Sequence, residues 1–313
     1  MEIVSNWLTM DDQVKVHVKQ WQVRGEKPRA ILQLSHGMAE HIERYDPFAQ
    51  YLVEKGIYVF GNDHRGHGQT GKSAGRMGFL AKQDGFERIV DDLYTITLHI
   101  QKEYPETPVF LLGHSMGSFV ARRYIQKYAD AIQGVIISGT AYSPGVAGKM
   151  GKMLALMEER RSGPTAPSPL MNRLVFGANN KSFHNPITAF DWLCSNSEVV
   201  ENYIDDPLCG FICSSRFFYD LLTGLEMIHD PNLIQTIPKD LPMLIFSGDM
   251  DPIGNNGKGI QKVVQQYKKN GLNNIEYKLF TNGRHEMLNE VNKDEVYTFV
   301  FDWIQKQIQR EAE

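Results

Sequence analysis

The feature that most constrains this chain is a Gly-His-Ser-Met-Gly turn, residues 113–117, set between an apolar run and a helical pattern. Residues 109–112 are continuously apolar, as in a strand buried on both faces, and residues 117–127 have helical periodicity. A strand, a sharp turn and a helix hold a serine at the apex, and the flanking glycines let backbone segments approach closely. Because glycine and serine are common, chance is the alternative. The context predicts that Ser115 is a nucleophile.

The alternation of strand and helix patterns continues along the chain. Two early segments, 3–9 and 14–22, alternate polar and apolar residues and predict an antiparallel edge. Further strands are expected at 30–34, 58–61, 134–137, 243–246 and 275–280, and helices at 47–54, 85–103, 257–270 and 294–310. This succession predicts an α/β fold in which a mostly parallel, doubly wound sheet carries helices on both faces.

The strand pattern stops between about residues 142 and 231. A stretch rich in Pro, Gly and Ser, residues 161–169, separates two apolar helical segments there. We therefore expect a core domain formed by residues 1–141 and 232–313, with residues 142–231 inserted as a helical cap over the end of the sheet.

A serine hydroxyl needs a base to take its proton, and the base needs an acid that orients it. The run 243–246 leads into a turn with Asp249 and Asp251, and the run 275–280 leads into His285, the only histidine after His229. We favour Asp251 because it lies three residues beyond Gly248, past the strand end. Asp249 is expected to face solvent or to hydrogen-bond within the turn. A surface-loop histidine is the alternative reading of His285.

An acyl-transfer site also needs backbone N–H donors for an oxyanion. The segment 35–38 follows a predicted strand, so we assign the amides of Met38 and Met116 to this role. Asp63, His64 and His67 have a spacing that suits a metal, but their glycine-rich surroundings favour a tight loop. Cys209 and Cys213 lie four apart without a second pair, and free thiols are expected. We predict neither a metal nor a cofactor.

Composition narrows the class of protein and its compartment. The chain has 33 basic and 37 acidic residues without a basic cluster, so we expect no nucleic-acid partner. Three cysteines, an odd number close together, favour a reducing compartment over a disulfide framework. The first residues lack the basic start of a signal peptide, and no apolar run approaches the ~18 residues of a membrane span. These observations predict a cytoplasmic protein without a transmembrane segment.

Three segments together, residues 36–45, 63–69 and 113–117, resemble the monoacylglycerol lipase and lysophospholipase group of α/β-hydrolases. The resemblance implies an eight-stranded α/β-hydrolase sheet and cleavage of carboxylic esters, monoacylglycerols or lysophospholipids, through an acyl-enzyme on Ser115. It also implies that Glu40 and Arg44 hold the glycerol head group; alternatively, they pair with each other or brace the loop. Animal monoacylglycerol lipases place a second histidine three residues after the catalytic one, where this chain has Leu288.

Other functions remain open on the same scaffold. A general carboxylesterase, an amidase or a peptidase uses the same triad, but proline-specific aminopeptidases usually carry a Gly/Pro-rich oxyanion loop, which residues 36–38 lack. A non-catalytic binding protein is disfavoured because all three triad residues are present. In the cap, Met150, Met153, Leu154 and Met157 recur at helical spacing. We expect this face to pack on the core; the alternatives are an acyl-chain tunnel or a lip that makes transient contact with a membrane surface.

Overall fold

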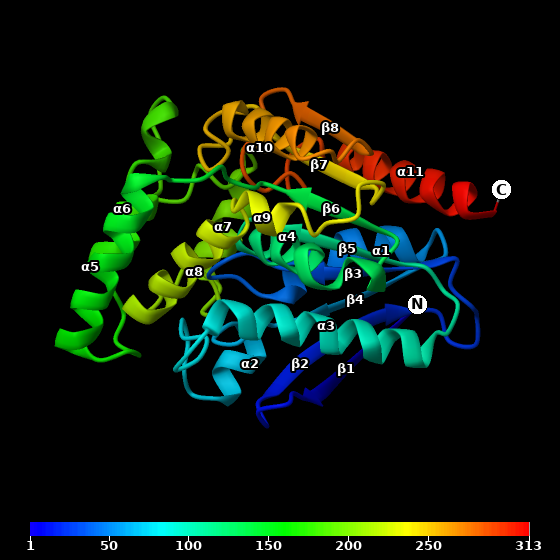
Figure 1. Ribbon diagram of the computed structural model, residues 1–313, viewed down its shortest axis with the longest axis horizontal. Helices are drawn as coiled ribbons and strands as arrows, with labels where there is room; N and C mark the ends of the chain where they lie inside the picture. Colours follow the sequence, from blue (N-terminus) through cyan, green and yellow to red (C-terminus); the bar gives the residue numbers. More distant parts are fainter. Residues whose placement is uncertain (313) are drawn as a thin grey trace.

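The computed structural model describes residues 1–312, and its centre is one eight-stranded sheet with the strand order β1-β2-β4-β3-β5-β6-β7-β8 (Figure 1). The strands are β1 (Glu2–Thr9), β2 (Lys15–Gln22), β3 (Ala30–Ser35), β4 (Ile57–Asn62), β5 (Val109–His114), β6 (Gly134–Ser138), β7 (Met243–Gly248) and β8 (Ile275–Phe280). Only the pairs β1–β2 and β2–β4 are antiparallel. The predicted antiparallel edge and the mostly parallel sheet are confirmed.

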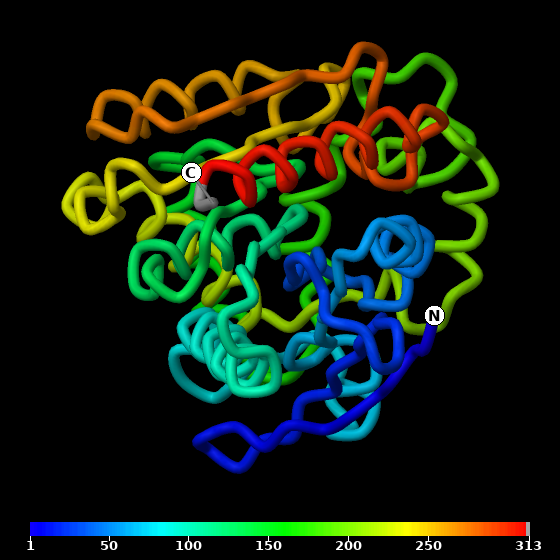
Figure 2. The backbone as a smooth tube through the Cα atoms, turned by 90° about the vertical axis from the view of Figure 1, so that its right-hand side faces the viewer, coloured from blue at the N-terminus to red at the C-terminus, as the bar shows by residue number. Residues whose placement is uncertain are grey.

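Helices cover both faces of the sheet, because alternate strand residues point to opposite sides. Val109 and Leu111 of β5 belong to the core beneath α3 (Gly85–Glu103), α4 (Met116–Tyr128) and α10 (Lys258–Lys269). Phe110 and Leu112 belong to the opposite core, beneath α1 (Asp46–Val53) and α11 (Lys293–Ala312). Figure 2 shows α11 in red beside α1 in blue. The predicted helices on both faces are confirmed.

Local boundaries differ from the sequence expectation by only a few residues at most. α3 has the predicted bounds, and β5 continues two residues further, to His114, so that the turn at Ser115 begins directly at the strand end. Short elements without a sequence signal are α2 (Gly68–Ser73) and the 3₁₀ turns η1 (Ile42–Tyr45), η2 (Ala129–Ala131) and η3 (Asn179–Ser182).

The inserted segment between β6 and β7 is helical throughout its regular structure. It contains α5 (Val146–Ser162), α6 (Pro169–Phe176), α7 (Ser197–Asp205), α8 (Ser215–Met227) and α9 (Pro231–Ile234). α5 and α6 lie at the end of the molecule away from both termini (Figure 1). α8 packs on α3 and α4, with Phe217 and Phe218 buried in that core, so it anchors the insertion. The division into core and cap at residues 142 and 231 stays a proposal.

Of the four residues expected to pack on the core, Leu154 of α5 does so, whereas for the three methionines that expectation is wrong. Met150, Met153 and Met157 are 66%, 67% and 64% exposed. The helix instead packs against α8, where a Cβ on Gly151 would lie 3.0 Å from Leu222, while Gly148 lies against Pro144. Close approach through small side chains turns the large ones outward. No helix within residues 1–312 combines the length and the apolar character that a membrane span requires.

Candidate active site

Ser115 occupies the sharp turn between β5 and α4. Its backbone has φ +52° and ψ −119°, a conformation that residues with a side chain rarely adopt. A Cβ on Gly113 would lie 2.1 Å from the Gly117 carbonyl oxygen, and one on Gly117 would lie 1.9 Å from that of Ser35. The Ser115 amide donates to the Ser138 carbonyl oxygen at 2.9 Å. The two glycines are thus required by close backbone packing around the serine.

Asp251 and His285 form a buried pair at the ends of β7 and β8. The distance from Asp251 Oδ1 to His285 Nδ1 is 3.0 Å, and both side chains are almost completely buried. The Ser247 hydroxyl donates to Asp251 Oδ2 at 2.7 Å, and the Ile253 amide donates to Oδ1 at 2.9 Å. Since an ionised carboxylate can only accept, the proton of the neutral imidazole lies on Nδ1 and Nε2 is left as the basic nitrogen.

Asp249 has a different role from Asp251. Its Oδ1 accepts a hydrogen bond from the Asn282 amide at 2.8 Å, and the side chain is partly exposed. The turns after β7 and β8 touch directly, because a Cβ on Gly248 would lie 1.9 Å from the Gly283 carbonyl oxygen. Asp249 therefore ties one turn to the other, and the structure places Asp251, not Asp249, against His285.

Asp251 and His285 each stabilise the charged form of the other. Burial alone would raise the pKa of Asp251, but His285 and the hydrogen bonds from Ser247 and Ile253 outweigh it and lower that pKa below its ordinary value. Burial alone would lower the pKa of His285, whereas Asp251 raises it above 6.5. The neighbouring His114 ring, 4.7 Å away between centroids, has its pKa lowered to about 4 by burial and by His285. Of these two imidazole rings, the site therefore favours a positive charge only on His285.

Ser115 and His285 line the same small hollow, which also contains Met38 and Gly37 of the loop after β3. A Cβ on Gly37 would lie 3.2 Å from the Ser115 Cβ, so this loop runs directly beside the serine. Within residues 1–312, neither the Met38 nor the Met116 backbone amide donates to another protein group. Both amides are free to donate to a bound ligand.

Glu40 and Arg44 form a buried ionic group with Glu286. Glu40 accepts hydrogen bonds from the Gly37 amide, from the Tyr45 hydroxyl at 2.9 Å and from the Arg44 guanidinium at 2.7 Å. Arg44 also binds both carboxylate oxygens of Glu286, at 2.7 and 2.6 Å. Burial would raise the pKa of Glu286, but Arg44 holds it at about 2. Sequence reasoning missed Glu286, although it directly follows His285.

The sequence matches one known protein family over most of its length. The family described as "Serine aminopeptidase, S33" matches residues 26–292. The chain belongs to this family. Like other members of the α/β-hydrolase superfamily, it carries its serine on a strand-to-helix turn of a mostly parallel sheet. The predicted α/β-hydrolase fold is confirmed.

Proteins that are similar to this chain in sequence or structure carry the names of lipases and esterases. The chain is 29% identical to the monoglyceride lipase of Rattus norvegicus over 74% of this chain and 68% of the relative. It is 25% identical to the monoacylglycerol lipase of Mycolicibacterium smegmatis over 88% of each chain. A thermostable carboxyl esterase from Bacillus coagulans, solved with glycerol, superposes with a TM-score of 0.90 at 27% identity, over 98% of this chain and 99% of that one. The resemblance to the monoacylglycerol lipase group is confirmed.

The histidines of the neighbouring loops brace this hydrolase site. His36 Nε2 accepts from the His64 amide at 3.0 Å, and His64 Nε2 lies 2.9 Å from the Ser35 hydroxyl. Burial lowers the pKa of His36 to about 4 and that of His67 to about 3, so both rings are neutral. Asp63 is engaged by His17 and by two backbone amides. These contacts match the tight loop that the sequence indicated.

A larger cavity of about 260 Å³ leads from Ser115 into the cap. Its aromatic lining comes from the insertion: Phe176, Phe190, Trp192, Tyr203 and Phe211. A separate hollow of about 750 Å³ is lined by the methionines of α5, but Ser115 is not part of it. The space for an apolar chain next to the serine is therefore made by these aromatic residues and not by the methionine face.

Proposed function

We propose that this protein is a serine hydrolase that cleaves small lipid esters, monoacylglycerols and lysophospholipids, with Ser115, His285 and Asp251 as its catalytic triad. The observation that carries the proposal is that Ser115 and His285 line one hollow while Asp251 holds His285 from behind. The names of the similar proteins, monoglyceride lipases and a carboxyl esterase, support ester substrates.

The proposed reaction proceeds in two acyl-transfer steps. His285 Nε2 takes the Ser115 hydroxyl proton while Oγ attacks the ester carbonyl carbon, and the Met38 and Met116 amides donate to the resulting oxyanion. The C–O bond to the alcohol then breaks, and His285 gives its proton to the departing oxygen. Water repeats the sequence on the acyl-enzyme, which releases the fatty acid and restores Ser115.

We assign the two sides of the ester to different cavities. The acyl chain occupies the larger cavity, where the aromatic side chains suit methylene groups and Asn172, Arg173 and Asn180 form a polar part of the wall. The alcohol lies toward the smaller hollow that Glu40 lines. Glu40 lines that hollow and is held by Arg44, and we assign these two residues to the glycerol hydroxyls.

The nucleophile is tested by Ser115→Ala. This variant should retain the fold and lose activity by about 10⁶-fold in kcat, the typical loss when a triad nucleophile is removed. A fluorophosphonate probe should label the wild-type protein at Ser115 and leave the variant unlabelled. Labelling of the variant at the wild-type level would place the nucleophile elsewhere.

The family description names an aminopeptidase, so a peptidase is the second candidate function. An aminopeptidase needs an acidic group for the ammonium of its substrate. Glu40 and Glu286 both lie near Ser115, but Arg44 already pairs with each of them. A panel of monoacylglycerols, p-nitrophenyl esters and aminoacyl p-nitroanilides separates the two functions, and turnover of the anilides alone would reverse the assignment.

We also propose that the cap contacts membrane surfaces and that the enzyme works in the cytoplasm. Val146, Met150, Met153 and Leu174 are 59–74% exposed on α5 and α6. Residues 142–183 contain six Lys or Arg and two Asp or Glu, a formal charge of +4, while the whole chain has −4. An apolar face with basic neighbours suits an anionic lipid surface. The three cysteines are free thiols, which is consistent with a reducing compartment and can be checked by cell fractionation.

A further inference from the structure

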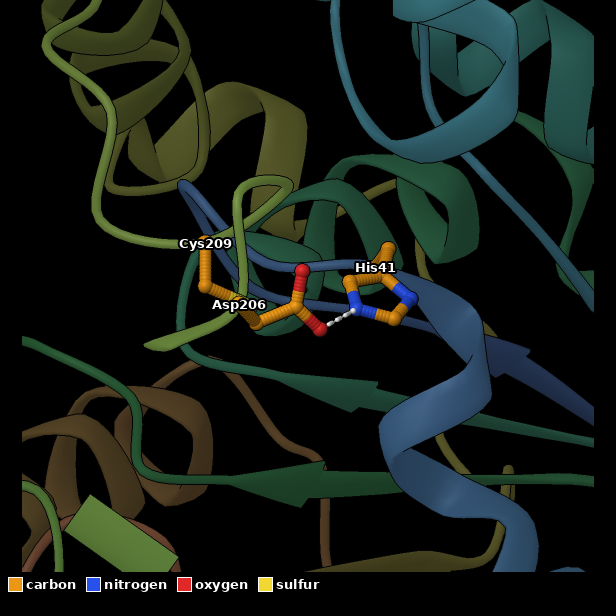
Figure 3. Close-up of side chains that lie close together, drawn as sticks. All are labelled: His41, Asp206 and Cys209. Atoms are coloured by element: carbon orange, nitrogen blue, oxygen red, sulfur yellow. Dashed lines mark hydrogen bonds and ion pairs between the residues drawn. The ribbon is translucent and has the colours of Figure 1, made fainter. Parts of the chain in front are cut away.

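Three metal-binding side chains from distant parts of the chain meet beside the active-site loop. His41 follows Glu40 on that loop, while Asp206 and Cys209 lie just after α7 in the insertion (Figure 3). One ligand atom from each residue can be chosen so that all three lie within 4.8 Å of one another. His41 Nε2 and Asp206 Oδ2 are already 2.8 Å apart.

We propose that His41, Asp206 and Cys209 form a binding site for one divalent transition-metal ion, Zn²⁺ by its ligand set. Imidazole, carboxylate and thiolate are the ligands that zinc accepts in tetrahedral sites. In such a site the ligand atoms lie roughly 3.3–3.6 Å apart, so the three groups need to move by about 1 Å. The proposal does not depend on the ester-hydrolase function.

Two anionic ligands would balance the charge of such an ion, which must displace the Cys209 thiol proton against a pKa that burial raises. One thiolate and one carboxylate neutralise its two positive charges, and the Cys209 thiol gives up its proton on binding, because thiolate is the ligand form. His41 and Cys209 are only 5% and 8% exposed, whereas the Asp206 side chain is 31% exposed. The ion would enter past Asp206, and water would be its fourth ligand.

A bound ion would connect the insertion to the loop beside Ser115. The same stretch of the insertion already holds this loop, since the Gly210 amide and the Tyr203 hydroxyl both donate to the Ala39 carbonyl oxygen, at 2.9 and 3.0 Å. Coordination would replace the direct contact between His41 and Asp206, the third link within three residues, by a metal bridge that also includes Cys209. The expected consequence is stabilisation of the closed arrangement of cap and core.

The sequence did not indicate this site. Local spacing pairs Cys209 with Cys213, and in the structure Cys213 is fully buried in the core, apart from the group. The true neighbour, His41, is 165 residues away from Asp206. Only the fold brings the three ligands together, so the sequence-based prediction that the chain binds no metal could not take them into account.

The test uses the chelator-treated full-length protein and metal ions alone. Titration with Co²⁺ should give a thiolate-to-cobalt charge-transfer band with one equivalent bound, and Zn²⁺ should abolish that band. Zn²⁺ at about a hundredfold excess over its Kd should raise the unfolding midpoint by roughly 4 °C. Cys209→Ala should lose the band and the shift, whereas the matched control Cys213→Ala should keep both.

Two results would overturn the proposal. Absence of the band in the wild-type protein would leave His41 and Asp206 as a plain ion pair, and a band that persists in Cys209→Ala would place the metal at another thiol. If Cys213→Ala fails to fold, Cys194→Ala serves as the control. If Cys209→Ala fails, Asp206→Asn replaces it, because asparagine retains a hydrogen bond to His41 but lacks the charge; its Co²⁺ affinity should fall at least tenfold.

Discussion

At the scale of single residues, the chemistry of the site depends on which carboxylate meets His285. Asp249 and Asp251 differ by two positions, and only the second is buried against the imidazole. The sequence favoured Asp251 because it lies three residues beyond Gly248, past the end of the strand. In the structure Asp251 indeed contacts His285. Glu286 could not be assigned in the same way, because its partner Arg44 lies 242 residues earlier in the chain.

The two aspartates can be separated by mutation. Asp251→Asn should lower kcat by about 10⁴-fold, because an amide stabilises the wrong imidazole tautomer and no longer balances its charge. Asp249→Asn is the matched control and should change kcat by less than about threefold, since its contact is a single hydrogen bond in a turn. The measurement is steady-state hydrolysis of a p-nitrophenyl ester by both variants. Reversed effects would exchange the roles of the two residues.

The pH dependence follows from the same pair. His285 acts as a base only when neutral, and Asp251 raises its pKa above 6.5, so kcat/KM should fall about tenfold per pH unit below a midpoint that lies above 6.5. Asp251 stays ionised across this range because its own pKa is lowered. The profile is measured by chromatographic quantification of the released fatty acid. A midpoint below 6.5 would show that burial outweighs Asp251.

At the scale of elements, the strands, the longer helices of the core and the turn that holds Ser115 were predictable because each has a local period or a steric requirement. The position of α5 was not predictable. The methionine repeat identifies an apolar face of the helix, but it does not show whether the core or solvent lies against that face. The loop of residues 36–45 is an intermediate case. Its motif was visible, but its hydrogen bonds, from the Gly37 amide to Glu40 and from Arg44 to Glu286, depend on the fold.

Glu40 of this loop has two proposed roles, bracing the Gly37 amide and holding the head group, which one variant can distinguish. Glu40→Ala removes the acceptor of the Gly37 amide, so the oxyanion donor next to it loosens, and kcat/KM for a p-nitrophenyl ester should fall about tenfold. With a monoacylglycerol of the same acyl chain, the loss of a head-group contact should add roughly another tenfold. Equal losses of kcat/KM on both substrates would mean that Glu40 only braces the loop and does not contact the head group. A loss of kcat/KM confined to the monoacylglycerol would mean that Glu40 does not brace the loop.

At the scale of the whole molecule, the layered α/β architecture was predictable from the succession of elements, whereas the relation of cap to core was not. The cap packs through α8 and through contacts between distant segments, and a sequence does not encode such contacts as a local pattern. The molecule is also electrically asymmetric, since the positive segment 142–183 belongs to a chain of negative net charge. Under the proposed membrane contact, this asymmetry would orient the apolar face of α5 and α6 toward an anionic surface.

Membrane contact can be measured by co-sedimentation with anionic and neutral vesicles. The wild-type protein should bind the anionic vesicles more tightly, and added salt should weaken that binding. Combining Met150→Ser with Met153→Ser should weaken binding about tenfold or more, since both side chains are two-thirds exposed and would enter the lipid. Tyr277→Ser, an exposed position on β8, is the control and should change nothing. Unchanged vesicle binding of the double variant would mean that this face of the cap does not contact the membrane.

The backbone connection between the insertion and the His285 turn limits how this enzyme can be recombined with its relatives. The amides of His285 and Glu286 donate to the carbonyl oxygens of Trp192 and Leu193, at 3.4 and 2.7 Å. A chimaera that exchanges the entire insertion would therefore replace backbone groups that hold His285, the proposed general base. Exchange of α5 and α6 alone leaves that support in place. The modular boundary for engineering substrate range thus lies inside the cap, between residues 176 and 192, and not at its junction with the sheet.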